Sequence, residues 1–403
     1  MALIKTKQIH NLATQFGTIS RPIAASDWDE CLAPNERIQM TDFYRNVHCI
    51  MGLPIDAMSM DEAVRQLQQA RITRQKCFFS TPNLNFMMAS QKQSHFRESV
   101  CMSDLSLPDG MPLVWVAKLL NIPIRERVSG SDLFDCLRQQ TESLWRVFFF
   151  GGPKGVGQSA CLAIGDQSAG VLPTGYIYPG FVNTEEMSRD DLVQCINQSE
   201  PDLVVVSLGA AKGQDWICRN RQHITAPVIG HLGAVINFVA GNIQRAPPWM
   251  QRAGLEWLWR AKEERTLIRR YLNDGLSFLR VLAIRVLPLA LHHAYQKPST
   301  EDLRNATAEY GRQESQGLVH LRGAWNASNL RPVRDIFTQI EHDNGNVVLN
   351  LSQVSSIDSA FVGLLLLLEQ SLASRQLSLC LSGTPPSIRR YLQLSGVQHL
   401  VIE

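Results

Sequence analysis

Two rhythms of apolar and polar residues alternate along residues 47–244. Short apolar runs of strand length, such as DLVVVSLG at 202–209, alternate with segments whose apolar residues recur at helical spacing. One such segment, MDEAVRQLQQARI, begins directly after Ser59, and Glu62 three residues later predicts a capping box at its start. Because strands alternate with helices, the pattern predicts an α/β fold with a Rossmann-like, mainly parallel sheet.

A second, smaller α/β unit is predicted at the C-terminal end, where strand-like and helix-like segments alternate three times. The stretch before it is poor in apolar residues and carries mixed charge, which predicts a linker. The first residues show no clear period and are interpreted as an extension. The expected parts are an N-terminal extension (1–46), an α/β core (47–244), a basic amphipathic appendage (245–297), a linker (298–316) and a small α/β domain (317–403).

The composition of the 403 residues excludes several classes of protein. Nine cysteines are scattered without a CxxC pair, so neither a zinc knuckle nor a thioredoxin-like site is indicated. Such cysteines are typical of reduced thiols in a cytosol. The formal net charge of +2 argues against nucleic acid as a partner of the whole chain. The N-terminal segment has no sustained apolar run, so no signal peptide is expected.

The charge is nevertheless uneven, because residues 245–297 hold ten Lys/Arg and four Asp/Glu. The same segment is rich in Leu, Val and Trp, and this combination predicts an element that meets a membrane surface or an anionic ligand. Trp249, Trp257 and Trp259 fit either a membrane interface or a packed helix face. The apolar stretch 281–291 contains Arg and Pro, and we expect it to be too short to span a bilayer.

Candidate chemistry lies where predicted strands end, since ligands of open α/β sheets bind beyond the carboxyl ends of the strands. Asp109 follows such a strand, and its carboxylate could act as a general base, although Asp-Gly is also a common turn. The glycines from Gly151 to Gly157 would let backbone N–H groups approach a diphosphate, although a tight strand-to-helix turn needs glycine anyway. A dinucleotide-dependent enzyme is not supported, because the GxGxxG fingerprint is missing.

An ordered series of short motifs makes a resemblance specific. TPN, DG, GSDL, GGPKGVG, GYxxPG, SLG, GxxGAxxNFxAG, RAPxWxxxxGLEWLWR and RRY follow one another over residues 47–275. The series resembles the WecG/TagA/CpsF group, glycosyltransferase family 26. The resemblance implies inverting transfer of a sugar from a UDP-sugar to a polyprenyl-diphosphate-linked acceptor. It also implies a cytoplasmic protein peripheral to the inner face of the membrane, with no metal or other cofactor.

The resemblance also assigns roles to residues at matching positions. Asp109 is the implied general base, and Thr81 and Asn83 line the region of the base and the acceptor. Gly151 and Gly152 are expected near the nucleotide, and Arg245, Arg269 and Arg270 are expected to face phosphate, as arginine forks do. The remaining implied substrate-binding residues are Gly110, Gly209, Lys212, Gln214 and Asn237.

The segment after SLG departs from the pattern of this group, which reads close to GxPKQExW. Ala211, Gly213 and Gln214 stand where the group has Pro, Gln and Glu, and Asn237 stands where it usually has Asp. Two charges are therefore missing on the donor side. Two interpretations stay open: an altered choice of donor sugar in surface or exopolysaccharide synthesis, or a catalytically impaired membrane scaffold.

The small domain resembles a STAS domain, the fold of anti-sigma-factor antagonists. Asp358 is well placed as the N-cap of an apolar helix, and Ser359 would occupy its first turn. In that family the serine can be phosphorylated, whereas a plain helix cap explains the same residues by chemistry alone. The resemblance implies a regulatory or interaction module whose partner is another protein or a kinase.

Overall fold

The computed structural model describes residues 41–401, which form one compact unit. The predicted N-terminal extension therefore lies outside the described residues up to residue 40. Some positions within the range are also outside the description: 142, 248, 251–253, 264–266, 296 and 314–315, together with the side chains of 166, 167, 263 and 267.

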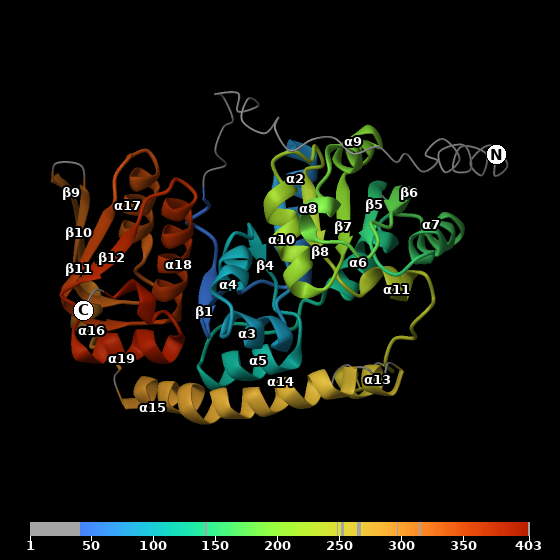
Figure 1. Cartoon of the computed structure of the whole chain (residues 1–403). Helices are drawn as coiled ribbons and strands as arrows, with labels where there is room; N and C mark the ends of the chain where they lie inside the picture. The colour runs from blue at the N-terminus through green and yellow to red at the C-terminus, as the bar shows by residue number, and fades with distance from the viewer. Residues whose placement is uncertain are drawn as a thin grey trace. The chain divides into compact units, whose positions relative to one another are not determined.

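A six-stranded parallel sheet forms the centre of the larger domain, with the strand order β4-β3-β8-β7-β5-β6 (Figure 1). This confirms the predicted α/β fold. The sheet order places β3, β8 and β7 side by side in the middle, as the apolar runs of these strands require. The six strands are β3 (Cys77–Ser80), β4 (Leu105–Ser106), β5 (Trp145–Gly151), β6 (Val171–Ile177), β7 (Leu203–Ser207) and β8 (Val228–His231).

Both faces of this sheet are buried by helices, and successive strand residues point to opposite faces. Phe149 packs into one core with Phe134, whereas Phe148 and Phe150 pack into the other with Trp216. The first core is covered by α2 (Met60–Thr73), α6 (Gly130–Gln139), α7 (Val156–Gln167) and α11 (Val235–Val239). The second is covered by α8 (Thr184–Met187), α9 (Asp190–Gln198) and α10 (Ala210–Asn220).

Local capping signals explain where two of these helices begin. Ser59 and Glu62 form the predicted capping box of α2, with both reciprocal hydrogen bonds present. Helix α6 begins at Gly130, because the side chain of Ser129 accepts the N–H of Asp132 and caps it.

A third core joins the remainder of the larger domain to the small domain. The larger domain contributes to this core the antiparallel hairpin of β1 (Val47–Ile50) and β2 (Leu53–Asp56) with α3 (Leu84–Ser90), α4 (Ser94–Cys101) and α5 (Met111–Leu119). The small domain contributes a four-stranded sheet of order β12-β11-β10-β9. The elements of the small domain are α16 (Thr300–Arg304), β9 (Thr307–Gln313), β10 (Gln316–Trp325), α17 (Arg331–Glu341), β11 (Val347–Ile357), α18 (Ser359–Ala373), β12 (Leu379–Ser382) and α19 (Pro386–Ser395).

The linker predicted for 298–316 is not an unstructured connection. It contains α16 and β9, and β9 pairs antiparallel with β10 as the edge strand of the small sheet. The sequence concealed this strand because an edge strand exposed on one face can be almost entirely polar. The small domain therefore begins before residue 317.

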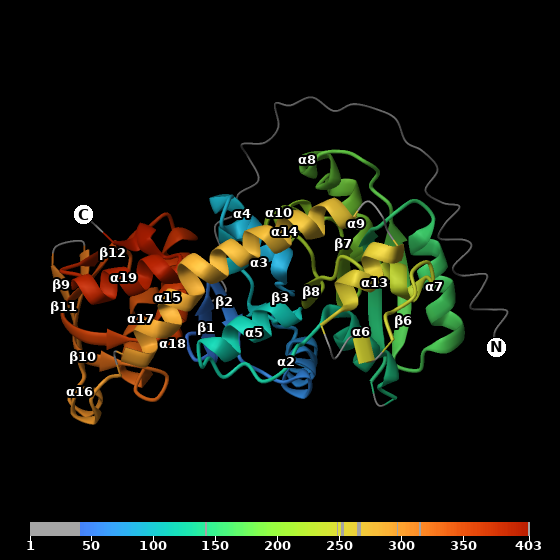
Figure 2. The same ribbon diagram turned by 90° about the horizontal axis from the view of Figure 1, so that it is seen from below.

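The basic appendage forms α13 (Glu256–Glu263) and one long helical run. The run consists of α14 (Leu267–Val281), a π-helical turn η1 (Leu282–Val286) and α15 (Leu287–Tyr295), and it passes beside α3 and α5 (Figure 2). Within the described residues, 268–295 is the one helix long and apolar enough to cross a membrane by length and composition. The apolar stretch 281–291, which was expected to be too short to span a bilayer, is part of this longer helix. Arg285 and Pro288 do not end the helix.

Candidate functional site

Asp109 lies at the carboxyl end of the sheet, between β4 and α5. Its backbone N–H donates to the carbonyl of Pro82, 2.8 Å away, and its side chain accepts a hydrogen bond from the N–H of Gly130. The residue is half-buried. Burial raises the pKa of Asp109 to about 7, although the nearby Arg127 opposes this change and Glu256 adds to it. A carboxyl group with this pKa can accept a proton near neutral pH.

The residues predicted to accompany Asp109 do lie beside it. Thr81 is buried and donates its hydroxyl to the carbonyl of His231, 3.3 Å away. Asn83 caps α3 by accepting the N–H groups of Asn85 and Phe86, and its Cβ is 3.6 Å from where a Cβ on Gly110 would lie. Gly110 has a φ of 130°, so the close turn behind Asp109 favours glycine.

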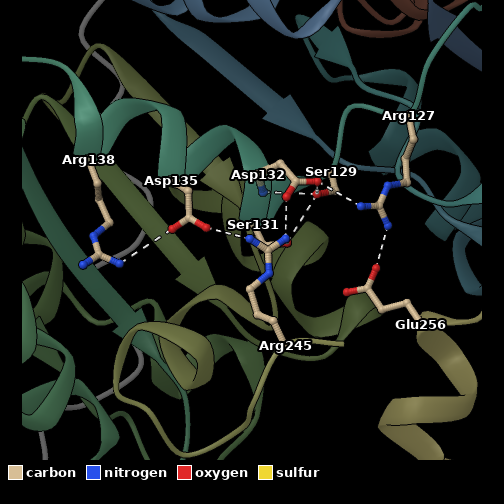
Figure 3. A network of polar contacts seen from close by, with 8 residues as sticks. All are labelled: Arg127, Ser129, Ser131, Asp132, Asp135, Arg138, Arg245 and Glu256. Carbon is tan, nitrogen blue, oxygen red and sulfur yellow. Dashed lines mark hydrogen bonds and ion pairs between the residues drawn. The ribbon is translucent and has the colours of Figure 1, made fainter. Parts of the chain in front are cut away.

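Figure 3 shows a network of charged residues, of which Arg127, Glu256 and Asp132 act on the pKa of Asp109. Arg127 bridges two carboxylates at one end of the network, 2.6 Å from Glu256 on α13 and 2.9 Å from Asp132 on α6. Arg245 pairs with Asp132 and, at 2.6 Å, with Asp135. Burial opposes ionisation of Asp132, but hydrogen bonds from Ser129 and Arg245 lower its pKa overall. The network therefore ties the appendage to the carboxyl end of the sheet.

Arg245 was predicted to face phosphate, and the structure instead pairs it with carboxylates. It lines a pocket of about 140 Å³ with Phe134, Arg138 and Phe238, and its guanidinium lies 5.9 Å from the centre of the Phe238 ring. An incoming phosphate would have to compete with Asp132 and Asp135 for this fork. The pocket is small and lies between α6 and α11.

The two glycines predicted near a nucleotide have a packing reason to be glycine. Gly151 and Gly152 have φ values of 99° and 79°. A Cβ on Gly151 would lie 2.7 Å from the carbonyl oxygen of Ser207, and one on Gly152 would lie 3.1 Å from Ile236. The strand-to-helix turn thus favours glycine with or without a ligand, so their role in nucleotide binding stays a prediction.

The residues predicted on the donor side, Gly209 to Gln214, lie at the start of α10. Gly209 precedes the first turn of α10, and Lys212 donates to the carbonyl of Val182, 3.1 Å away. Gln214 is fully buried, and its amide atoms have no hydrogen-bond partner in the described part of the chain. A Cβ on Gly213 would lie 2.3 Å from the His231 ring, so that ring fills the space of a side chain at 213.

The remaining predicted substrate-binding residues lie on two other helices, α11 and α14. Asn237 is half-buried on α11. Arg269 and Arg270 are exposed on α14, and neither forms an ion pair with any residue that the structure describes. The guanidinium of Arg270 lies 5.3 Å from the ring centre of Tyr271. The structure does not bring these two arginines into the network of Arg127.

Sequence reasoning missed Arg127 and Glu256 as members of the site. Glu256 lay inside the GLEW motif, but nothing in its spacing indicated a partner 129 residues earlier in the chain. A charge pair this distant in sequence is visible only once α13 is placed over the sheet.

Comparisons with known proteins agree with this architecture. A model described as the glycosyl transferase WecG/TagA/CpsF family matches residues 48–290, more than half of the chain. A relative from Bacillus spizizenii is 29% identical over 197 residues, covering 49% of this chain and 75% of the relative. A relative from Staphylococcus aureus (strain MRSA252) is 23% identical over 215 residues, covering 53% and 83%. Both are named N-acetylglucosaminyldiphosphoundecaprenol N-acetyl-beta-D-mannosaminyltransferase.

The small domain matches a second model, described as Mlab, STAS domain, over residues 308–402. That match starts at residue 308, inside the predicted linker, which agrees with the observation that β9 belongs to the small domain. A solved structure of the anti-sigma factor antagonist SpoIIAA in its unphosphorylated form is 21% identical, with a TM-score of 0.23, covering 24% of this chain and 86% of that one. At this TM-score the assignment of the domain rests on the family model.

Proposed function

The chain belongs to the WecG/TagA/CpsF family of glycosyltransferases, and we propose that it moves a sugar from a UDP-sugar to a polyprenyl-diphosphate-linked acceptor in the synthesis of a surface polysaccharide. The names of the relatives support the acceptor class, since both act on a sugar linked through diphosphate to undecaprenol. The UDP-sugar donor and the polysaccharide pathway belong to the proposal.

The observation that carries this proposal is the environment of Asp109. Its carboxylate removes the proton of the acceptor hydroxyl as that oxygen attacks the anomeric carbon of the donor sugar. The bond from the anomeric carbon to the diphosphate oxygen breaks, and UDP leaves with both electrons. A base with a pKa of about 7 suits this step, and Arg127 beside it stabilises the carboxylate before the proton is taken.

The proposal is tested by incubating the full chain with a panel of UDP-sugars and an undecaprenyl-diphosphate-linked N-acetylglucosamine acceptor. UDP release should require both substrates and fall at least about a hundredfold in Asp109→Asn. Asp190→Asn, at an exposed position on α9, is the matched control and should keep full activity. No turnover with any donor, together with no binding of UDP or UDP-sugar in calorimetry, would instead favour the scaffold interpretation suggested by Gln214 and Asn237.

We also propose that the appendage holds the protein on the cytoplasmic face of a membrane. Seven exposed aliphatic side chains on α14 to α15 follow one another in steps of four, four, three, five, three and four residues: Ile268, Leu272, Leu276, Leu279, Ile284, Leu287 and Leu291. The five-residue step crosses the π-helical turn, which keeps the stripe on one face. The opposite face is held to the protein by buried Val286 and Leu289, which favours a helix lying in the interface over a spanning one.

Vesicle sedimentation tests this membrane proposal. With vesicles containing anionic lipid, the paired change of Leu276 and Leu279 to Asp should abolish sedimentation. Ile72→Asp is the matched control, because Ile72 is 76% exposed on α2, away from the stripe. Equal sedimentation of both variants would contradict the assignment of the stripe.

A further inference from the structure

Ser359, the residue singled out by the STAS resemblance, is not open to solvent. It is 8% exposed, and its Oγ forms a hydrogen bond of 2.9 Å with Nδ1 of His48 on β1. Asp358 before it caps α18 by accepting the N–H of Phe361, as the sequence predicts. The first turn of α18 is therefore covered by a strand of the transferase domain.

The helix that carries Ser359 is enclosed on both sides. Ten consecutive residues, 359–368, are buried. Gly363 shows how close the covering strand lies, because a Cβ there would be 2.9 Å from the carbonyl oxygen of Val47 and 3.1 Å from the backbone of His48. A helix surface packed this tightly against a strand resembles a protein interior rather than a loose domain contact.

Several polar contacts fix the same arrangement around its edges. Arg334 of α17 donates to the carbonyls of Phe43 and Arg45, and the N–H of Thr41 donates to Glu341. The Sγ of Cys49 lies 3.8 Å from the carbonyl oxygen of Ser395 at the end of α19. The β1–β2 hairpin and the segment 41–45 before it thus contact three helices of the STAS domain.

Among the described residues, the side chains identified around Ser359 offer little to neutralise an added negative charge. Burial, and to a lesser extent the charge of Arg334, lowers the pKa of His48 to about 4, so its ring is neutral near pH 7. Arg334, the positive group that acts on His48, donates to the backbone carbonyls of Phe43 and Arg45. The carboxyl group of Asp358 is itself buried beside Ser359. An anion placed here would be buried without a partner, which is costly.

We propose that the STAS domain is docked in cis, with its α18 face bound to the β1–β2 hairpin of its own chain, and that a negative charge at Ser359 releases it. In the docked state the hairpin occupies the surface that an outside protein would need. The release exposes that surface and the hairpin together. This inference does not depend on the proposed sugar transfer.

Natural cysteines report the release directly. Cys49 faces α19 and becomes accessible when the hairpin separates from the STAS domain. Cys77 lies in β3, buried in the sheet of the transferase domain, and becomes accessible only when that domain unfolds. Burial raises the pKa of Cys49 to about 12 and that of Cys77 further, so both are unreactive while covered. The ratio of their labelling rates separates undocking from unfolding.

The experiment labels the full chain with iodoacetamide and follows each cysteine by mass spectrometry. Ser359→Glu should speed the labelling of Cys49 at least about thirtyfold and leave Cys77 unchanged. Ser359→Ala, which removes only the hydrogen bond, should stay within about fivefold of the unsubstituted chain. Labelling of Cys49 in Ser359→Glu no faster than in Ser359→Ala would overturn the proposal.

A second pair of variants tests docking without adding charge. Gly363→Ala places a methyl group against the hairpin backbone and should release Cys49 with Cys77 still protected. Gly165→Ala on α7, where nothing lies within 4 Å, is the matched control and should change neither rate. If either Ser359→Glu or Gly363→Ala exposed Cys49 and Cys77 equally, the STAS domain would be an inseparable part of the fold and the proposal would be wrong.

Discussion

Replacing Asp109 with Asn should make the protein more stable while it abolishes activity. In the folded protein burial holds the pKa of Asp109 at about 7, far above the ordinary value of an aspartate. Ionising the carboxyl group therefore costs the folded state more than the unfolded state. This cost is absent at acidic pH, where both states are protonated, grows as the pH rises toward 7, and is constant above it. Asparagine has nearly the same shape and is neutral at every pH, so the variant does not have this cost.

The size of the effect follows from the change in pKa. A tenfold change in a protonation equilibrium is worth about 1.4 kcal/mol, so a rise to about 7 corresponds to about 4 kcal/mol for a fully buried group. Asp109 is partly exposed, and solvent screening reduces this figure by roughly half. We expect Asp109→Asn to raise the free energy of unfolding by about 2 kcal/mol at pH 8 and by close to zero at pH 4.

Urea unfolding at pH 4, 6 and 8 measures this difference. Asp132→Asn is the control of opposite sign, because hydrogen bonds from Ser129 and Arg245 overcome burial and lower the pKa of Asp132. That variant should lose stability at pH 8, and the loss should disappear as the pH falls below the ordinary range of an aspartate. A destabilised Asp109→Asn at pH 8, or a gain that does not depend on pH, would refute the reasoning.

Two further predictions concern the neighbours of this carboxyl group. Arg127→Gln should move the ascending, acidic limb of the pH–activity profile to higher pH and Glu256→Gln should move it lower, because their charges act in opposite directions on the pKa of Asp109; shifts of the same sign would contradict the assignment. Gly213→Ala should cost about 1–3 kcal/mol in urea unfolding, because the new methyl group meets the His231 ring, and His231→Ala should restore most of the loss; additive losses in the double variant would show that the ring and the glycine are not coupled.

Local signals in the sequence were sufficient for the framework of the fold. The alternation that sends Phe148 and Phe149 to opposite faces of β5 follows from the pleat of a strand. The capping box at Ser59 joins residues three positions apart, so the sequence contains the whole interaction. Asp358 was predicted as a cap for the same reason.

The features that the sequence did not reveal depend on distant partners. Arg127 meets Glu256 across 129 positions, and Ser359 meets His48 across 311. No spacing rule connects residues this far apart, and each looks like an ordinary surface group when considered alone. Strand β9 escaped notice because its first five residues alternate between exposed and half-buried environments and the rest are exposed, so it has no buried apolar side. The burial of the STAS helix is likewise a property of the assembled chain.

The most direct test of the proposed chemistry is the pH dependence of kcat/KM for transfer to the polyprenyl-diphosphate acceptor. If Asp109 is the base, log kcat/KM rises with pH and levels off near pH 7, the pKa of that group. In Asp109→Asn the residual rate should lack this inflection. A profile that is flat in the unsubstituted chain, or an inflection near 7 that survives in Asp109→Asn, would contradict the assignment of Asp109 as the catalytic base.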